Sequence, residues 1–97
     1  MSTREHVNRL LKLVSKHFKM SKTEILEHTR SQRNLRARAA AVKLIRDTLK
    51  LSYPKLGLVF NQNHATMINA YNNANMWLSE DRSFRDAYIN VEADLRG

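Results

Sequence analysis

A short polar stretch after Phe60 has the side chains best suited to contact the edges of nucleic acid bases. It consists of Asn63, His64, Ala65 and Thr66. Asparagine can pair with adenine through two hydrogen bonds, threonine can donate or accept, and an alanine methyl fits against the thymine methyl. Asn69, Asn72 and Asn73 extend the same face if the segment is helical, and that face has no charged residue. The pattern predicts contact with the DNA major groove. The simpler alternative is that Asn63 only caps a helix and His64 has no partner.

Basic residues form the second candidate element. The net charge of +8 lies in residues 1–50, which balance to +9, whereas residues 51–97 balance to −1. Residues 28–46 contain no acidic side chain but include Arg30, Arg33, Arg36, Arg38, Lys43 and Arg46. Such one-sided charge indicates a polyanion partner, either nucleic acid or an anionic membrane surface. We expect Arg30, Arg33, Arg36, Arg38 and Lys55 to contact phosphate or the minor groove.

The elements that must position these residues are helices. Glycine occurs only at Gly57 and Gly97 and proline only at Pro54, so tight hairpins are disfavoured and glycine-rich phosphate loops are excluded. Apolar residues recur at helical spacing and predict an all-α, compact bundle of about six helices within one domain, residues 1–97. The expected helices cover residues 4–18, 21–29, 37–49, 52–60 and 63–78, with a last one after residue 81 or 83. Residues 30–34 are expected to form a basic loop.

The fourth and fifth of these helices form a predicted helix-turn-helix. Ser52 can cap the first of them, Pro54 suits its first turn, and Gly57 indicates a close approach by the following helix. After a corner at Asn61 and Gln62, the second helix has an apolar face of Met67, Ala70, Tyr71, Ala74, Trp77 and Leu78. Trp77, Tyr71 and Phe84 are expected to form a core cluster, and the last helix adds Tyr88, Ile89 and Val91. In a helix-turn-helix, the second helix enters the major groove.

The order of these segments resembles a known family. SKTEIL, RSQRNLRARAAAVKLIRDTL, SYPKLGLVF and NHATMINA follow one another as in the C-terminal domain of the bacterial replication initiator DnaA, a Trp-repressor-like helix-turn-helix. The resemblance covers about residues 5 to 95. It implies a regulator or accessory factor of replication initiation or transcription that binds double-stranded DNA and has no ATPase of its own.

Individual roles follow from the resemblance position by position. It implies that Arg30 enters the minor groove, that Asn63, His64 and Ala65 match the family's base-reading Asp-His-Thr, and that Thr66 matches the next threonine. It also implies that Tyr53 and Pro54 lie against the phosphate backbone, and we expect Asn69 to face the major groove and Gln62 the backbone. Phe60 is followed by Asn-Gln-Asn-His where the family has Gly-Gly-Arg-Asp-His, so the turn is one residue shorter. Aspartate accepts from cytosine, whereas asparagine prefers adenine.

Other classes of function have less support. The chain has no cysteine, its four histidines are scattered, and no nucleophile and base can be paired, so we expect no cofactor, no metal, no small-molecule substrate and no enzymatic activity. Without a long apolar run or a secretory signal, a cytoplasmic, nucleoid-associated location is expected. Further expected partners are a replication initiator or other replication proteins. Two alternatives remain: a protein-interaction adaptor that retains the fold but has lost specific DNA recognition, and a basic domain on an anionic membrane.

Overall fold

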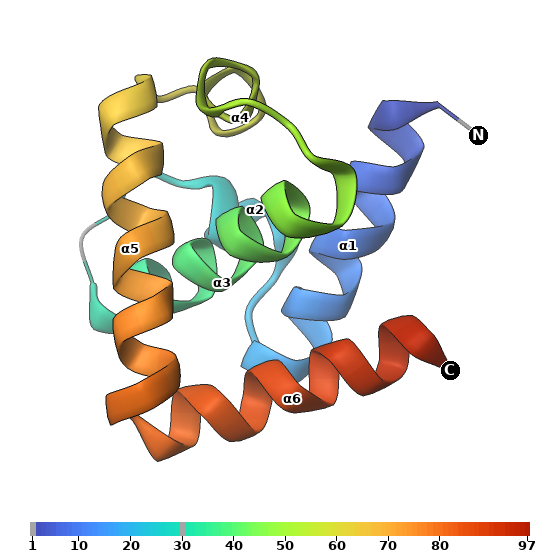
Figure 1. Cartoon of the computed structure of the whole chain (residues 1–97), viewed down its shortest axis with the longest axis vertical. Coiled ribbons are helices and arrows are strands. Elements are labelled where there is room, and N and C mark those ends of the chain that lie inside the picture. Colours follow the sequence, from blue (N-terminus) through green and yellow to red (C-terminus); the bar gives the residue numbers. More distant parts are fainter. Residues whose placement is uncertain (1, 30) are drawn as a thin grey trace.

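The chain forms a bundle of helices around a central one. The computed structural model describes residues 2–29 and 31–97, and within them it contains six helices and no strand. They are α1 (Thr3–Phe18), α2 (Lys22–Leu26), α3 (Gln32–Leu49), α4 (Tyr53–Phe60), α5 (His64–Glu80) and α6 (Arg82–Arg96). Helix α3 contacts α1, α2, α4 and α5, while α6 packs against α1 and α5 (Figure 1). The predicted all-α architecture is confirmed.

The centre of the core is the alanine-rich part of α3. Its buried apolar residues are Ala37, Ala39, Ala40, Ala41, Val42, Leu44 and Ile45. Small side chains let neighbouring helices approach closely, and burial around most of the helix circumference is typical of a central helix. All buried apolar residues of the described chain join in one cluster with this helix. The prediction of a central, buried third helix is confirmed.

Each helix begins with a side-chain cap. The capping residues are Ser2, Ser21, Ser31, Ser52, Asn63 and Asp81. Each accepts a hydrogen bond from a backbone N–H of the first turn, an interaction that contributes about 1 kcal/mol to helix stability. At Ser21 the predicted capping box is complete, because the Glu24 carboxylate also accepts from the Ser21 N–H at 3.0 Å.

The boundaries around the basic segment differ from the prediction. Helix α3 begins at Gln32 rather than Ala37, because Ser31 accepts from the Asn34 N–H at 3.2 Å and its hydroxyl donates to the Asn34 side chain at 2.6 Å. Arg33 therefore lies in the first turn of a helix and not in a loop. Helix α2 ends at Leu26, before the expected Thr29, and residues 27–29, called the connector below, lie outside the helices.

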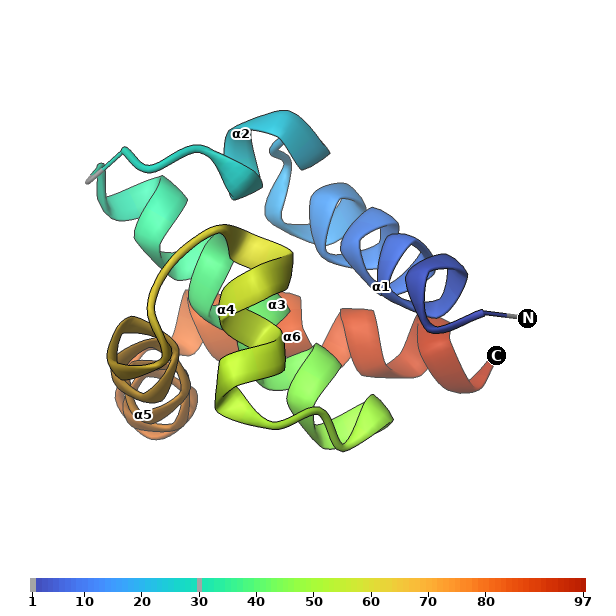
Figure 2. The same cartoon turned by 90° about the horizontal axis from the view of Figure 1, so that it is seen from above.

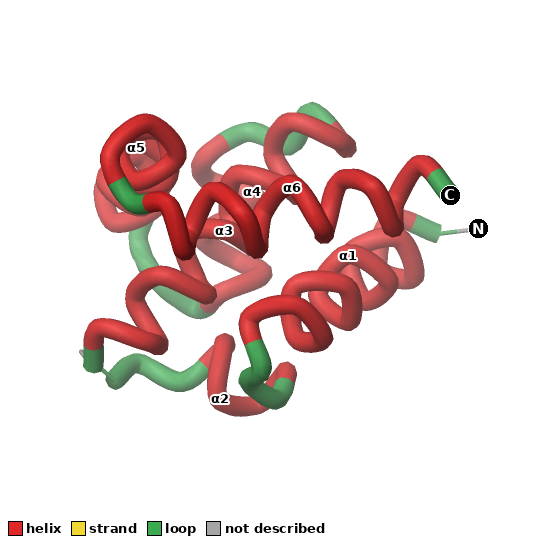
Figure 3. The backbone as a smooth tube through the Cα atoms, turned by 90° about the horizontal axis from the view of Figure 1, so that it is seen from below, coloured by secondary structure: helices red, strands yellow, loops and turns green. Residues whose placement is uncertain are grey.

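The aromatic packing also corrects two expectations. Trp77 and Phe84 do pack together, with ring centroids 5.7 Å apart, but Tyr71 lies elsewhere and packs edge-on against Tyr53 at 6.1 Å. Ile89 is 49% exposed, because it lies on the outer face of α6. No helix of the described residues is long and apolar enough to cross a membrane. Viewed from below, α1 and α6 lie side by side, and the start of α6 meets the end of α5 (Figure 3).

Candidate nucleic-acid interface

The turn between α4 and α5 is fixed by backbone contacts. Asn61 ends α4 in the left-handed conformation with φ of 53°, and the Gln62 N–H donates to the Gly57 carbonyl at 2.9 Å. A Cβ atom on Gly57 would lie within 3.0 Å of the Gln62 carbonyl oxygen, nearer than real Cβ atoms approach. A close approach at Gly57 is thus found, as predicted, but the backbone of the turn at Gln62 makes it and not the following helix. This contact fixes where α5 starts relative to α4.

The start of α5 presents the predicted polar side chains to the surface. Asn63 Oδ1 accepts from the Thr66 N–H at 2.9 Å and from the Thr66 hydroxyl at 3.0 Å, so its side-chain oxygen is used as a cap. His64, Ala65 and Asn69 are exposed, and so are Asn72 and Asn73 on the same helix. Every residue of α5 before Glu80 is uncharged. The predicted outward face of α5 thus exists, and Asn63, which caps the helix, is exposed as well.

The connector between α2 and α3 is bonded to the end of α4. The His28 ring nitrogen Nε2 lies 3.2 Å from the carbonyl oxygen of Phe60, the last residue of α4. The C-terminal carbonyls of a helix lack partners within the helix, so a donor from outside satisfies one of them. Seen from above, the connector and the start of α5 lie on the same side of the molecule (Figure 2). Arg30, the expected minor-groove residue, lies outside the described residues.

Arg38 has a structural position, which corrects its predicted role at phosphate. Its side chain is buried, with 5% of the residue exposed. The guanidinium donates to the carbonyl oxygens of Ile25 at 3.1 Å and Thr29 at 3.2 Å, and also to that of Glu27. Burial lowers the pKa of the Arg38 guanidinium. These donors hold the end of α2 and the connector onto α3 and are not available to DNA.

Arg36 pairs with Asp81 at the junction of α5 and α6. Its Nε donates to Asp81 Oδ2 at 2.9 Å, and its guanidinium lies 4.7 Å from the centre of the Trp77 ring. This half-buried pair joins α3 to the start of α6, so Arg36 does not have the free side chain expected of a phosphate contact. Arg33 is exposed and donates to the Lys19 carbonyl at 3.0 Å.

A cation and aromatic cluster, absent from the sequence-based prediction, anchors α4 and α5 on α3. The Arg46 guanidinium lies 3.8 Å from the centre of the Tyr53 ring and 5.7 Å from that of Tyr71. The Tyr71 hydroxyl donates to Asp47 Oδ1 at 2.6 Å, and Lys43 donates to Asp47 Oδ2 at 2.8 Å. Desolvation raises the pKa of Asp47, but the hydrogen bonds from Lys43 and Tyr71 outweigh it and the pKa is lowered.

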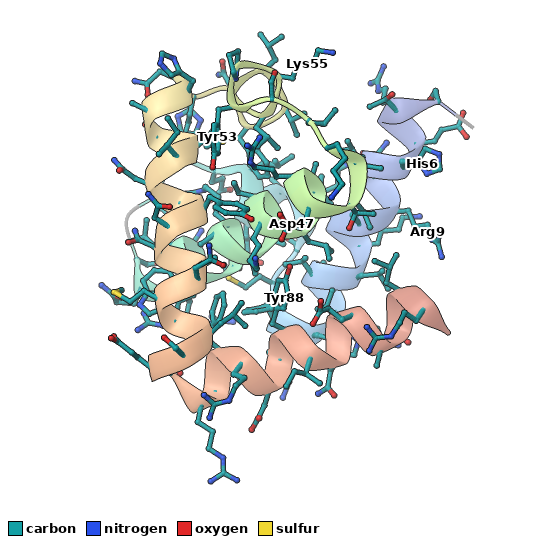
Figure 4. The ribbon with its side chains drawn as sticks, in the orientation of Figure 1. His6, Arg9, Asp47, Tyr53, Lys55 and Tyr88 are labelled. Atoms are coloured by element: carbon teal, nitrogen blue, oxygen red, sulfur yellow. The ribbon has the colours of Figure 1, made fainter. Side chains whose placement is uncertain are left out.

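Three further predicted residues lie on α4 and the turn. Pro54 and Lys55 are exposed, and Lys55 projects outward from α4, whereas Tyr53 points toward the body of the molecule (Figure 4). Gln62 is half-buried, and its Oε1 has no hydrogen-bond donor among the described residues. The structure thus brings together α4, the turn and the start of α5, with the connector beside them. The same described residues hold no cluster of histidine and carboxylate side chains that could bind a metal.

Comparison with known proteins agrees with this geometry. The family model described as the bacterial dnaA protein helix-turn-helix matches residues 7–73, which include all of α4 and the first part of α5. The chromosomal replication initiator protein DnaA of Tropheryma whipplei (strain Twist) is 29% identical over 88 residues, covering 90% of this chain and 18% of the relative.

Two further relatives show the same degree of similarity. DnaA 1 of Chlamydia muridarum is 29% identical over 83 residues, covering 86% of this chain and 18% of the relative. DnaA of Bacteroides thetaiotaomicron is 29% identical over 91 residues, covering 93% of this chain and 19% of the relative. The chain thus spans less than a fifth of the length of these curated relatives. Since the family model matches more than half of the chain, including the turn between α4 and α5, the chain belongs to the bacterial DnaA helix-turn-helix family, a family of DNA-binding domains.

Proposed function

We propose that residues 1–97 form one domain that binds double-stranded DNA and acts as a regulator or accessory factor of replication initiation or transcription. Helix α5 enters the major groove, α4 lies along the phosphate backbone, and the connector lies at the adjacent minor groove. The observation that supports this arrangement most directly is the His28 to Phe60 hydrogen bond. It holds the connector beside the turn of the helix-turn-helix, so one duplex can touch both.

The proposed contacts divide into base edges and backbone. The base-edge set is Asn63, His64, Ala65, Thr66 and Asn69. Arg30 is proposed for the minor groove, and the backbone set is Arg33, Tyr53, Pro54, Lys55 and Gln62. Support comes from the exposure of His64, Ala65 and Asn69 on α5 and of Arg33 and Lys55 on flanking helices. Arg36 and Arg38 are left out, since Asp81 and the connector carbonyls occupy their donors.

The division matters because the two sets affect binding differently. Phosphate contacts release counterions, so each cation contributes to the dependence of affinity on salt concentration. The neutral face of α5 contributes little to this term and can only discriminate between base pairs. We therefore expect affinity to depend on Lys55 and Arg33, and sequence preference to depend on His64 and Asn69.

A salt titration tests the proposal. Binding to a duplex that contains the DnaA box and to a shuffled duplex is measured by fluorescence anisotropy at several salt concentrations. Lys55→Gln should reduce the slope of log affinity against log salt by about 1 on both duplexes. His64→Ala should leave that slope unchanged and should reduce the difference between duplexes by about 1 to 3 kcal/mol if the box is recognised. Arg9→Gln is the control, since Arg9 is exposed on α1, far from α5 (Figure 4).

The titration can contradict either DNA binding itself or the proposed set of contact residues, and the two outcomes differ. No measurable binding to either duplex at low salt would overturn the DNA-binding proposal. Binding with the same loss for all three variants would overturn the proposed interface while leaving DNA binding in place. The regulatory role is tested separately, by asking whether the chain displaces a full-length DnaA initiator from a box-containing duplex.

A further inference from the structure

Helix α4 has a large apolar side chain on the side that faces away from the core. Leu58 is 83% exposed, more than the other large exposed apolar residues, Met76 at 42% and Ile89 at 49%. A single exposed leucine is ordinary in a folded protein, so the surroundings of Leu58 decide its significance. On α4, Leu58 is followed by Val59, which is half-buried.

Leu58 and Val59 form one wall of a groove between α1, α2 and α4. The groove has a volume of about 500 Å³. This is within the range of ligand-binding hollows, which run from roughly 300 to 1,000 Å³. Its apolar lining consists of Val7, Leu11, Leu26, Leu58 and Val59. Since these side chains come from three helices, the groove can bury several apolar side chains of a bound molecule.

The polar lining of the groove carries only positive charge. Arg4 of α1 and Lys22 of α2 line it, together with Thr3 and Asn8, and no acidic residue does. The Lys22 Nζ donates to Asn8 Oδ1 at 2.6 Å, so this cation is held at the edge of the groove. Arg4 is exposed, and neither Arg4 nor Lys22 forms an ion pair with the described residues. A bound segment with carboxylates beside its apolar side chains would complement both parts.

We propose that this groove docks an acidic amphipathic helix of a partner protein. Helix-in-groove recognition places apolar residues at spacings of three and four into a hydrophobic cleft, as Leu58 and its neighbours allow here. The carboxylates of the partner pair with Arg4 and Lys22 at the edge. Duplex DNA does not fit such a lining, because a phosphate backbone offers no apolar side chains to it.

A second copy of this chain fits less well. The exposed side of its α6 combines Ile89 with cations and carboxylates, including Arg82 and Asp86 in an ion pair. Such a mixed face does not complement a groove whose only charges are positive.

The groove and the DNA contacts occupy different sides of the helix-turn-helix. Most of the groove lining comes from α1 and α2, on one side of α4, whereas the proposed base contacts lie at the start of α5 (Figures 1 and 2). Leu58 borders both surfaces, because it also lines a shallow hollow with Pro54, Asn63 and His64. A helix in the groove would therefore sit beside a bound duplex without covering α5. The inference does not depend on the proposed DNA contacts.

A displayed library of random 16-residue peptides, selected on the immobilised full chain, provides the probe. We expect the enriched peptides to have apolar residues at helical spacing and an excess of Asp and Glu. The enriched peptide that binds most tightly is then synthesised as a free peptide and added to the ¹⁵N-labelled chain. In ¹H–¹⁵N spectra it should change the chemical shifts of residues in α1, α2 and α4 and not of those at the start of α5. Leu58→Ala and the double variant Arg4→Gln, Lys22→Gln should each lower the affinity for this peptide at least about fivefold.

Ile89→Ala is the matched control, because it removes an exposed apolar side chain from α6 and should leave peptide affinity within twofold. Leu58 is exposed, so its replacement should not unfold the chain, and a thermal melt of each variant verifies this. An absence of enriched peptides, enrichment of basic peptides, or equal losses for Leu58→Ala and Ile89→Ala would each overturn the proposal. Self-association that depends on Leu58, without peptide binding, would overturn it in favour of a second copy.

Discussion

The ring nitrogen Nε2 of His28 and the carbonyl oxygen of Phe60 lie 3.2 Å apart. The two residues are 32 positions apart in sequence and belong to the two elements that the charge pattern and the helical corner predicted independently. On the other side of the connector, Arg38 donates to the carbonyls of Ile25 and Thr29. The connector is therefore held between α3 and the end of α4, beside the turn that precedes α5.

Replacing His28 with alanine should loosen the connector. A hydrogen bond contributes about 1 kcal/mol, so a DNA affinity that depends on the placed connector should fall roughly fivefold. The ratio of affinities for two DNA sequences should not change, because the residues on α5 are untouched. Anisotropy titrations measure both quantities. His6→Ala is the control, since His6 lies on α1, on the opposite side from α5 (Figure 4). Equal losses for the two variants would contradict a role of the connector.

Gly57→Ala should destabilise the chain, although alanine is the better helix former. In an exposed helix this change would add about 1 kcal/mol of stability. Here the new Cβ atom would collide with the Gln62 carbonyl, and the turn that starts α5 would have to move. Overpacking of this kind costs about 1 to 3 kcal/mol. Urea unfolding monitored by circular dichroism gives the sign of the change in the free energy of unfolding. A more stable variant would show that the turn can move at little cost and would contradict this prediction. Ala93→Gly, at an exposed position of α6, is a control for helix propensity alone.

Arg38→Gln and Arg33→Gln should affect different properties. Glutamine at position 38 leaves connector carbonyls without donors in a buried site, and each such group costs about 1 to 3 kcal/mol. Stability should therefore fall by about 2 kcal/mol or more in urea unfolding. Arg33→Gln, at an exposed position, should change stability by less than about 0.5 kcal/mol and should reduce the salt dependence of DNA binding. A stable Arg38→Gln variant with weakened DNA binding would reverse this assignment.

The positions of Arg33 and Arg38 show how far the sequence could predict the fold and the site. Helix type, order and capping followed from local patterns, because caps and apolar spacing act within one or two turns. The early start of α3 was missed because Ser31 to Asn34 has no apolar residue. The burial of Arg38 could have been predicted from the sequence, because Arg38 precedes Val42 by four residues and Ile45 by seven. This spacing places it on the same apolar face of the helix. Its partners are carbonyls of another segment, which no spacing reveals.

The cluster around Asp47 had no such sign in the sequence. Arg46 and Tyr53 come from α3 and α4, and Tyr71 comes from α5. Their contacts arise only when three helices pack together, so neighbouring residues in sequence say nothing about them. The exposed face of α5 was predicted correctly because helical periodicity alone separates it from Met67 and Ala74.

Asn63→Asp should change base preference without loss of stability. Aspartate caps a helix as well as asparagine does, and its charge is favourable at a helix N-terminus, so the bond to the Thr66 N–H is retained. Its carboxylate can only accept, which favours the cytosine amino group over adenine. Selection of binding sites from a random duplex library should show the change at one base pair, at about 1 to 3 kcal/mol. An unchanged preference would mean that Asn63 acts only as a cap, and Asn72→Asp gives the effect of charge alone.

Asp81 should make the junction of α5 and α6 sensitive to acid. The Phe84 N–H and then the Arg36 side chain donate to its carboxylate and lower its pKa below the ordinary value of 3.8. A carboxyl group with a lowered pKa in the folded state adds stability at pH values above 3.8, and this stability is lost as the pH falls through the lowered value. Asp81→Asn retains a cap but loses the ion pair.

The free energy of unfolding of Asp81→Asn should therefore be below that of the parent chain at neutral pH, by roughly 1 kcal/mol or less for a partly exposed pair. The difference should shrink as the pH is lowered below 3.8, because the parent then loses the same interaction. Urea unfolding at a series of pH values measures it. Asp86→Asn is the control, since its ion pair with Arg82 is longer, at 3.8 Å, and exposed. A difference that stays constant down to the lowest pH would mean that Asp81 stabilises the junction by its cap alone.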